Sequence, residues 1–290
     1  MNRNGQDAPR PRDATPNRAD QKATLNYIQL EAKFLTEKPY EFISQAPEGC
    51  PRKNFTLAAS PEQTIHDIRG SEELFNLDDH AFQVVKQEIR AIPTDQKGIE
   101  CDYLPKIVEL LQSIDPGAEV VVFDWRLRTS DYTRTTAKAG SVIDLDDPML
   151  ILKPVHAVHV DQSPLAATRR VNHHMGDRAQ ELLQRRFRII NTIQPHNLIA
   201  VDHVRKNYQG EGLYPLYDEA MKWYYLHRQT KDEVLLFKTF DSMSVEEGVK
   251  ARSQSGGGGE LLKVGSCSKP PTPSRESIEV RAMVFSKVGG

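Results

Sequence analysis

The chain has 290 residues, of which 38% are hydrophobic and 27% charged, and its formal net charge is −2. This composition is typical of a soluble globular protein with a substantial core, and the length permits one large β-rich domain. The near-neutral balance lacks the basic surface that nucleic acid or an anionic membrane attracts, so we expect neither as a partner. The sequence leaves the oligomeric state open.

Targeting signals and cysteine spacing indicate the compartment. The N-terminal residues are charged and contain no apolar core of the kind that a secretory signal has. No apolar run approaches the roughly 20 residues that a membrane-spanning helix needs. The three cysteines, Cys50, Cys101 and Cys267, are far apart and form no CxxC pair, which is typical of a reducing compartment. We therefore expect a cytoplasmic protein.

Two stretches of unusual composition bear on the domain organisation. Residues 1–22 are polar and proline-bearing, and predict a disordered N-terminal tail. Residues 253–273 contain four consecutive glycines followed by a cluster of prolines, and predict a long flexible loop. We expect the rest of the chain to form a single domain over residues 23–290, with this loop inside it.

The predicted elements of the first half follow from local periodicity. Residues 64–69 alternate between apolar and polar side chains and predict a strand that Gly70 ends. Residues 102–113 place leucine, isoleucine and valine at helical spacing and predict a helix. Residues 119–127 are the clearest strand in the chain, because they are rich in valine and aromatic residues.

The second half predicts one more helix and mostly strands. Residues 177–186 predict a helix with Asp177 as its N-cap, and the arginine- and histidine-rich stretch before it predicts a solvated surface. Further strands are expected at 157–160, 187–191 and 277–285, and a hairpin at 223–226 and 233–238. Short strands separated by turns, with few helices, indicate a mainly β sandwich or jelly roll with flanking helices.

The sharpest local feature is the pair His159 and Asp161. In the expected strand, residues two apart point to the same face, so the imidazole and the carboxylate would aim at a common point. Two histidines and one carboxylate on one face form the triad that binds iron(II) and leaves positions open for other ligands. An ordinary polar pair at the end of a strand accounts for the same residues and, taken alone, is the more common case.

A second feature, Arg275 and Ser277, opens the last expected strand. An arginine fork binds a dicarboxylate such as 2-oxoglutarate in bidentate fashion, and a nearby hydroxyl adds a further hydrogen bond. The alternative is that Arg275 and Arg281 merely solvate one face of the strand, and without context this alternative is favoured. The order of the two features along the chain, however, is the order expected of 2-oxoglutarate-dependent oxygenases.

These features lie within a longer resemblance. The stretches 158–163 (VHVDQS) and 275–281 (RESIEVR), with others between Ala23 and Phe285, resemble a fungal hydroxylase/desaturase family. Its members include the aspergillic acid hydroxylase and the gibberellin desaturase, and it is similar to a subunit of a bacterial cephem methoxylase. The resemblance implies a double-stranded β-helix (a cupin-like jelly roll) that uses iron(II), 2-oxoglutarate and oxygen on a small-molecule secondary metabolite.

The same resemblance implies residue roles. His159 and Asp161 would be catalytic metal ligands, and Arg275 with Ser277 would hold the 2-oxoglutarate cosubstrate. The resemblance does not choose between hydroxylation and desaturation, and it does not name the substrate.

The chain departs from the family at the third metal ligand. The family places a Pro-His-x-x-Phe phrase between an Asp-Ser pair, here Asp241-Ser242, and the last strand, whereas no histidine follows His227 here. Two explanations keep the metal site. The glycine-rich loop is a mis-spliced or mispredicted stretch of a gene whose true product keeps the histidine, or His227, less readily His203, substitutes for the missing ligand. Cys267 lies near the expected position, but a thiol in such a loop is more often inert.

A third explanation changes the function. The protein would be a metal-independent or catalytically dead member of the same fold that binds a metabolite, guides a non-redox step or partners an active homologue. The missing histidine favours this alternative, and the rest of the resemblance favours an active oxygenase.

Overall fold

The computed structural model describes residues 20–43, 45–88, 93–131, 133–135, 147–190, 198–204, 209–243 and 276–287. Most of the expected tail and the whole of the expected glycine-rich loop lie outside these residues. The first described strand, β1 (Gln21–Ala23), begins two residues before the position at which we expected the folded domain to start.

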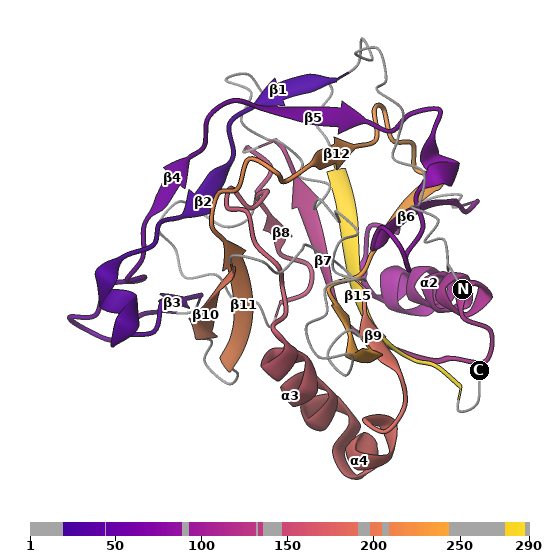
Figure 1. Ribbon diagram of the computed structural model, residues 1–290. Helices are drawn as coiled ribbons and strands as arrows, with labels where there is room; N and C mark the ends of the chain where they lie inside the picture. The colour runs from indigo at the N-terminus through magenta and orange to yellow at the C-terminus, as the bar shows by residue number, and fades with distance from the viewer. Residues whose placement is uncertain are drawn as a thin grey trace, which may run out of the picture.

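The main sheet has five strands, and its two longest, β7 and β15, run antiparallel side by side through the middle of the molecule (Figure 1). Both coincide with strands that the sequence predicted. In spatial order the sheet consists of β14 (Phe240–Asp241), β9 (Phe187–Ile189), β15 (Glu276–Phe285), β7 (Glu119–Thr129) and β8 (Ile151–Leu152).

Four smaller sheets lie around this centre, and in Figure 1 those containing β1 and β10 lie above it and to its left. Two have three strands each: β1, β5 (Gln63–Asp67) and β12 (Trp223–Tyr225), and β11 (Gln209–Pro215), β10 (Leu198–Val204) and β3 (Tyr40–Phe42). Two are strand pairs: β13 (Glu233–Phe237) with β6 (Phe82–Lys86), and β2 (Asn26–Ile28) with β4 (Leu57–Ala59).

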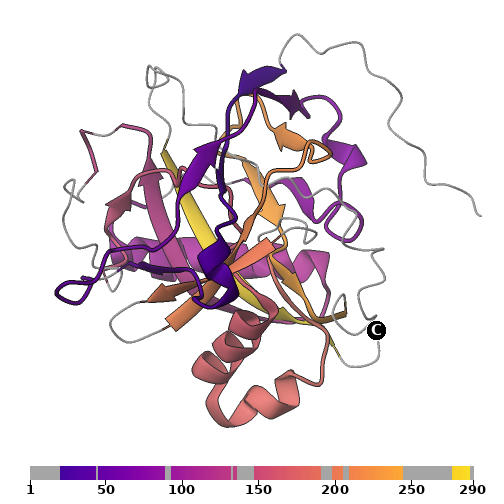
Figure 2. The same ribbon diagram turned by 60° about the vertical axis from the view of Figure 1, so that its left-hand side comes forward.

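Helices flank the strands, as expected. The predicted helix at 102–113 is α2 (Leu104–Ile114), preceded by the one-turn α1 (Gln96–Gly98) and a π-helical turn (Ile99–Tyr103). Figure 2 shows α3 (Pro164–Met175) and α4 (Ala179–Leu182) together at the lower edge of the molecule, joined by a 3-10 turn (Gly176–Arg178). Two further 3-10 turns are Ala32–Leu35 and Glu72–Leu74.

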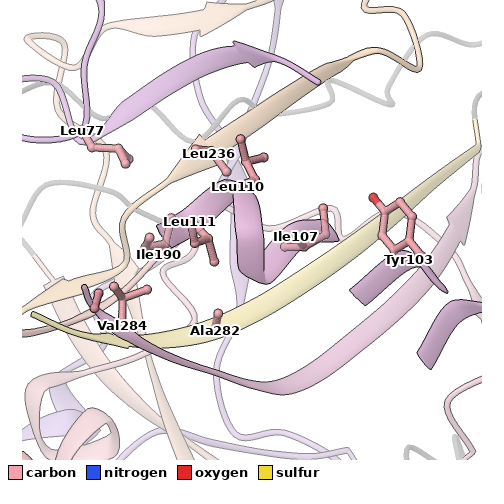
Figure 3. Packing of buried hydrophobic residues seen from close by; sticks show 10 residues of the cluster. Leu77, Tyr103, Ile107, Leu110, Leu111, Ile190, Leu236, Ala282 and Val284 are labelled. Atoms are coloured by element: carbon pink, nitrogen blue, oxygen red, sulfur yellow. The ribbon is translucent and has the colours of Figure 1, made fainter. Parts of the chain in front are cut away.

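Strand β15 separates two hydrophobic clusters because its side chains alternate between faces. Ala282 and Val284 pack with Ile107, Leu110 and Leu111 of α2, an arrangement shown in Figure 3. Met283 and Phe285 point to the opposite face and pack with buried residues of α3, α4 and β9. All four of these β15 side chains are at most 2% exposed, so the C-terminal half of β15 is a central core strand.

A β-bulge interrupts the pairing of β7 with β15. Asp124 pairs with Arg281 and Val122 with Ala282, so that Phe123 is an extra residue without a pairing partner on β15. A bulge of this kind places two consecutive side chains opposite one residue of the neighbouring strand. Val121 and Phe123 join the cluster under α3 and α4, while the paired Asp124 and Arg281 form an ion pair.

The helix predicted at 177–186 is present only in part, as the 3-10 turn and the four-residue α4, and the prediction that Asp177 caps it is wrong. The main helix of this region, α3, begins after Ser163, whose hydroxyl accepts a hydrogen bond from the backbone N–H of Ala166 at 3.1 Å. Pro164 occupies the first turn, where its missing N–H costs nothing. Asp177 lies in the 3-10 turn and makes no side-chain cap there.

Two other predictions about strands are wrong. Residues 157–160 form no strand, because Val158 donates to a carbonyl of β2 and Val160 pairs with β11, which leaves the segment without a continuous ladder. The expected hairpin also does not form. Strand β12 pairs in parallel with β5, and β13 pairs antiparallel with β6.

Candidate functional site

The segment that carries His159 and Asp161 is held between two sheets. The N–H of Val158 donates to the Asn26 carbonyl of β2 at 2.9 Å. Val160 and Leu213 of β11 exchange two backbone hydrogen bonds, of 2.7 and 2.9 Å. The isolated bridge at Val160 keeps the extended geometry at this point, so the side chains of His159 and Asp161 emerge on the same side, as predicted.

His159 and Asp161 converge on one point. The Nε2 atom of His159 lies 3.3 Å from Oδ1 of Asp161, and the two side chains are 13% and 18% exposed. The Nδ1 atom of His159 lies 2.9 Å from the Ala157 carbonyl oxygen. Since a carbonyl oxygen only accepts, Nδ1 carries a proton, and in the neutral ring Nε2 presents its lone pair toward Asp161.

Two atoms with lone pairs at this distance repel each other unless a positive charge lies between them. That charge is either a second proton on the imidazole or a metal ion. Metal bonds to histidine nitrogen and carboxylate oxygen are about 2.0–2.2 Å long, and two such bonds at a right angle place the donor atoms about 3 Å apart. The pair therefore fits two adjacent positions of a divalent metal ion, with the imidazole oriented by its second nitrogen.

Arg281 of β15 contacts the other oxygen of Asp161. Its Nε donates to Oδ2 at 2.7 Å, and its side chain is 11% exposed. Burial by itself would raise the pKa of Asp161, but the charge of Arg281 and its hydrogen bond act in the opposite direction, and that pKa lies well below the usual range. Asp161 is thus a carboxylate at neutral pH, as a metal ligand must be.

The contacts of Arg281 extend into a ladder of charges on the inward face of β7 and β15. Arg281 binds Asp124 through Nη1 and Glu279 through Nη2, both at 2.8 Å. Arg126 binds Asp124 at 2.9 Å, and Arg128 binds Glu279 at 2.9 Å. With Asp161, the ladder contains three guanidinium groups and three carboxylates, so its formal charges cancel.

The other predicted site residues are placed as follows. Arg275 lies outside the described residues. Ser277 is paired with Arg128 across the strands, on the same face of the sheet as Glu279 and Arg281. Ser277 therefore lies four residues before Arg281 on the same face of β15, with Glu279 between them.

The two candidate substitute histidines do not reach the pair. The Nε2 atom of His203 lies 3.2 Å from the Tyr214 hydroxyl, and the centroid of the Tyr214 ring lies 5.9 Å from that of the His159 ring. His227 follows β12, and its backbone N–H donates to Asp67 at 3.0 Å. Within the described part of the chain, no third His, Cys, Asp or Glu joins His159 and Asp161 in a metal-binding group.

Sequence reasoning missed Arg281, which it assigned to a solvated face. A signal was present in the two longest strands. Asp124, Arg126 and Arg128 alternate with apolar residues on β7, and Glu279 and Arg281 do so on β15. Charges at every second position of strands that are otherwise apolar indicate a face with ion pairs inside the protein.

Comparisons with known proteins place this chain in a class of oxidoreductases. A family model described as "Oxidoreductase/YMDC permease-like domain" matches residues 25–197 and 191–285. These segments cover most of the chain, and the chain belongs to this family.

Several fungal proteins are similar along most of their length. The "Fe(II)/2-oxoglutarate-dependent dioxygenase nvfI" of Aspergillus novofumigatus is 29% identical, over 89% of this chain and 94% of that protein. The "Hydroxylase/desaturase efuI" of Hormonema carpetanum is 26% identical, over 90% of this chain and 94% of that protein. The "Hydroxylase/desaturase poxK" of Penicillium oxalicum is 27% identical, over 85% and 86%.

A solved structure confirms the fold. The "iron and alpha-ketoglutarate-dependent endoperoxidase NvfI" superimposes with a TM-score of 0.69 at 24% identity, covering 93% of this chain and 99% of that chain. The expected cupin-like jelly roll is therefore confirmed. Among the residues that the structure describes, no helix is both long and apolar enough to span a lipid bilayer.

Proposed function

We propose that this protein is an iron(II)- and 2-oxoglutarate-dependent oxygenase that hydroxylates or desaturates a small-molecule secondary metabolite. The observation that carries the proposal is the convergence of His159 Nε2 and Asp161 Oδ1 at 3.3 Å, a geometry that suits two adjacent ligands of one cation. The names of the relatives support the identity of the metal and of the cosubstrate. They disfavour the alternative of a metal-independent or catalytically dead member of the fold.

The residues of this chain bind and orient. Iron(II) with 2-oxoglutarate supplies the capacity to activate oxygen, and His159 with Asp161 would hold the metal. Arg275 and Ser277 would hold the cosubstrate. The side chains around the pair are largely buried, which limits the access of water to the reacting carbon.

Charge balance on the inward face supports this assignment. The three arginines of the ladder are already matched by Asp124, Glu279 and Asp161, so a dianion alone would leave uncompensated negative charge. A divalent cation at His159 and Asp161, together with Arg275, would supply the positive charge that a dicarboxylate needs in this partly buried site. The site is therefore suited to the metal and the cosubstrate as a pair.

The third protein ligand is best sought among the histidines. Eight of the nine histidines lie in the described part of the chain. Among these eight, no second histidine joins His159 and Asp161 to form a group of three possible metal ligands. The ninth, His196, lies outside it. Substitution of His196, His203 and His227 by alanine, one at a time, identifies the histidine whose loss weakens metal binding.

We further propose that the protein acts in the cytoplasm, without a nucleic-acid or membrane partner. The near-neutral net charge of −2 supports the absence of an electrostatic attraction to either.

The test measures iron content and succinate formed from 2-oxoglutarate by the purified chain, after anaerobic loading with iron(II). The iron content is measured without a substrate, so the substrate need not be known for this part of the test. His159→Ala should abolish both signals, whereas the control His156→Ala, at an exposed position three residues earlier, should retain them. Equal iron binding by the parent chain and by His159→Ala would refute the proposal.

A further inference from the structure

The two oxygens of Asp161 face different partners. Oδ1 lies 3.3 Å from His159 Nε2, on the side where a metal ion fits. Oδ2 accepts a hydrogen bond of 2.7 Å from Nε of Arg281. The hydrogen bond from Arg281 occupies one lone pair of Oδ2 and fixes the orientation of the carboxylate, so that Oδ1 is the oxygen presented toward His159.

Arg281 is itself held in place. Each of its three guanidinium nitrogens contacts a different acid: Nε contacts Asp161, Nη1 contacts Asp124 and Nη2 contacts Glu279, at 2.7, 2.8 and 2.8 Å. Because the guanidinium is planar, it cannot turn toward or away from Asp161 without losing the other two contacts. Its direction is thus set by β7 and β15, and not by the loop that carries Asp161.

The backbone fixes the position of Arg281 along the strand. The pairing of β7 with β15 shifts between Arg281 and Ala282, directly after the pair of Arg281 with Asp124. Strand β15 then continues into the core, where Met283 is fully buried. The guanidinium therefore projects from the point at which the charged face meets a rigid hydrophobic cluster.

We propose that Arg281 is a positioning residue that confines Asp161 to metal binding through one oxygen. This inference rests on the proposed function, because it assumes that His159 and Asp161 hold a divalent metal ion. One-oxygen binding leaves one more coordination position open at the metal than two-oxygen binding does. The arginine would thereby help to reserve the positions that a cosubstrate and oxygen require.

The proposal predicts that metal binding changes when the forked guanidinium of Arg281 is replaced by a side chain that keeps only its positive charge. In Arg281→Lys, a single ammonium group can contact Asp161 but cannot contact Asp124 and Glu279 with the same fixed geometry. Asp161 then turns more freely, and its Oδ1 is no longer held in position beside His159. Arg128→Lys is the matched control, because Arg128 shares Glu279 with Arg281 and is similarly buried, at 16% exposure against 11%.

The experiment titrates the purified full chain with Co²⁺ alone and records both the dissociation constant and the visible absorption of the bound ion. Absorption in the visible range reports the number and arrangement of the ligands, which a loss of stability by itself does not change. We expect Arg281→Lys to bind Co²⁺ about 10–100-fold more weakly, in the range typical of lost contacts behind a metal ligand, with an altered spectrum. Arg128→Lys should match the parent chain in both.

Each other result overturns the inference. If Arg281→Lys matches the parent chain in affinity and spectrum, or if both lysine variants are weakened alike with an unchanged spectrum, Arg281 does not position Asp161. If the parent chain binds no Co²⁺, the proposed function fails and the inference falls with it. Should Arg281→Lys not fold, Asp124→Ala decides in its place, because it removes one of the three contacts that hold Arg281: a changed Co²⁺ spectrum supports the inference, and an unchanged one overturns it.

Discussion

Asp161→Asn separates the structural role of this residue from its role toward a metal. Asparagine keeps the shape of the side chain, and its carbonyl oxygen can still accept the hydrogen bond from Arg281, which measures 2.7 Å in the parent chain. The substitution removes the negative charge. The amide side chain would thus be a neutral neighbour of His159 and a poor ligand for iron(II).

The cost in stability follows from the contacts that remain. Removal of one partner of a buried ion pair costs about 3–5 kcal/mol when the other partner is left alone. Here Arg281 keeps Asp124 and Glu279, so we expect a loss of about 1–3 kcal/mol, a reduced share of that range. At about 2–4 °C per kcal/mol for a domain near this size, Tm should fall by several degrees.

The response to metal should change more than the stability. A ligand present at 100 times its Kd stabilises the folded state by about 2.7 kcal/mol, which raises Tm of the parent chain by roughly 5–10 °C. Asp161→Asn should show almost none of this rise. The assay is thermal unfolding followed by circular dichroism, with and without Co²⁺.

A control distinguishes loss of a ligand from general weakening. Asp241 is also a buried acid with two cationic partners, Arg186 and Lys238, at 2.7 and 2.9 Å. Asp241→Asn should lose comparable stability and keep the rise in Tm with Co²⁺. If Asp161→Asn keeps the full rise, Asp161 is not a ligand and the reasoning is refuted.

Three further predictions concern elements around the site. Ser163→Ala removes the N-cap of α3 and should lower the free energy of unfolding in urea by about 1 kcal/mol; no change would mean that the cap hydrogen bond contributes nothing. In Gly212→Ala the new methyl group would lie 2.7 Å from the His203 ring and 3.1 Å from a backbone oxygen, so we expect a loss of about 1–3 kcal/mol and weaker Co²⁺ binding, and an unchanged titration would contradict this. The hydrogen bond with Arg69 lowers the pKa of Glu233 from 4.5 to about 2, so the stability from this pair is present above about pH 4.5 and is lost as the pH falls toward 2. Glu233→Gln should therefore flatten the decline of stability in that window, and parallel curves for both proteins would contradict the assignment.

The parts of the fold that the sequence predicted are those whose pattern is local. Strands β5, β7 and β15 alternate or form apolar runs over their own length, and α2 repeats its apolar residues at helical spacing. Each of these elements buries a face that its own residues define. Periodicity was therefore sufficient to find them.

Pairing between distant segments was not predictable in the same way. Strands β12 and β13 are close in sequence, and proximity favours a hairpin, yet they pair with β5 and β6. The choice depends on burial across the whole domain, which a single segment does not encode. Helix α3 was missed although Ser163 and Pro164 are a recognisable start signal, because its later turns are rich in arginine and histidine and its apolar face is narrow.

The site was predicted in part and for a partly wrong reason. His159 and Asp161 do converge, but an isolated bridge at Val160 aligns them, and not the strand that we expected. The role of Arg281 depends on two strands far apart in the sequence, β7 and β15, and emerges only when their register is known. The proposed cosubstrate role of Arg275 remains a prediction.

The extra residue on β7 has a consequence for how this fold can vary. Strand β7 has 11 residues against the 10 of β15, and the pairing is regular on both sides of Phe123. The Phe123 ring lies beneath the Arg170 guanidinium of α3, 4.6 Å from its centre, at the boundary between the charged face and the core. Deletion of Phe123 would leave the pairing of every other β7 residue with β15 unchanged. It would remove the aromatic ring that lies between the charged face and the core. Relatives that differ in length at this position would thus have a differently shaped inner wall on the same scaffold.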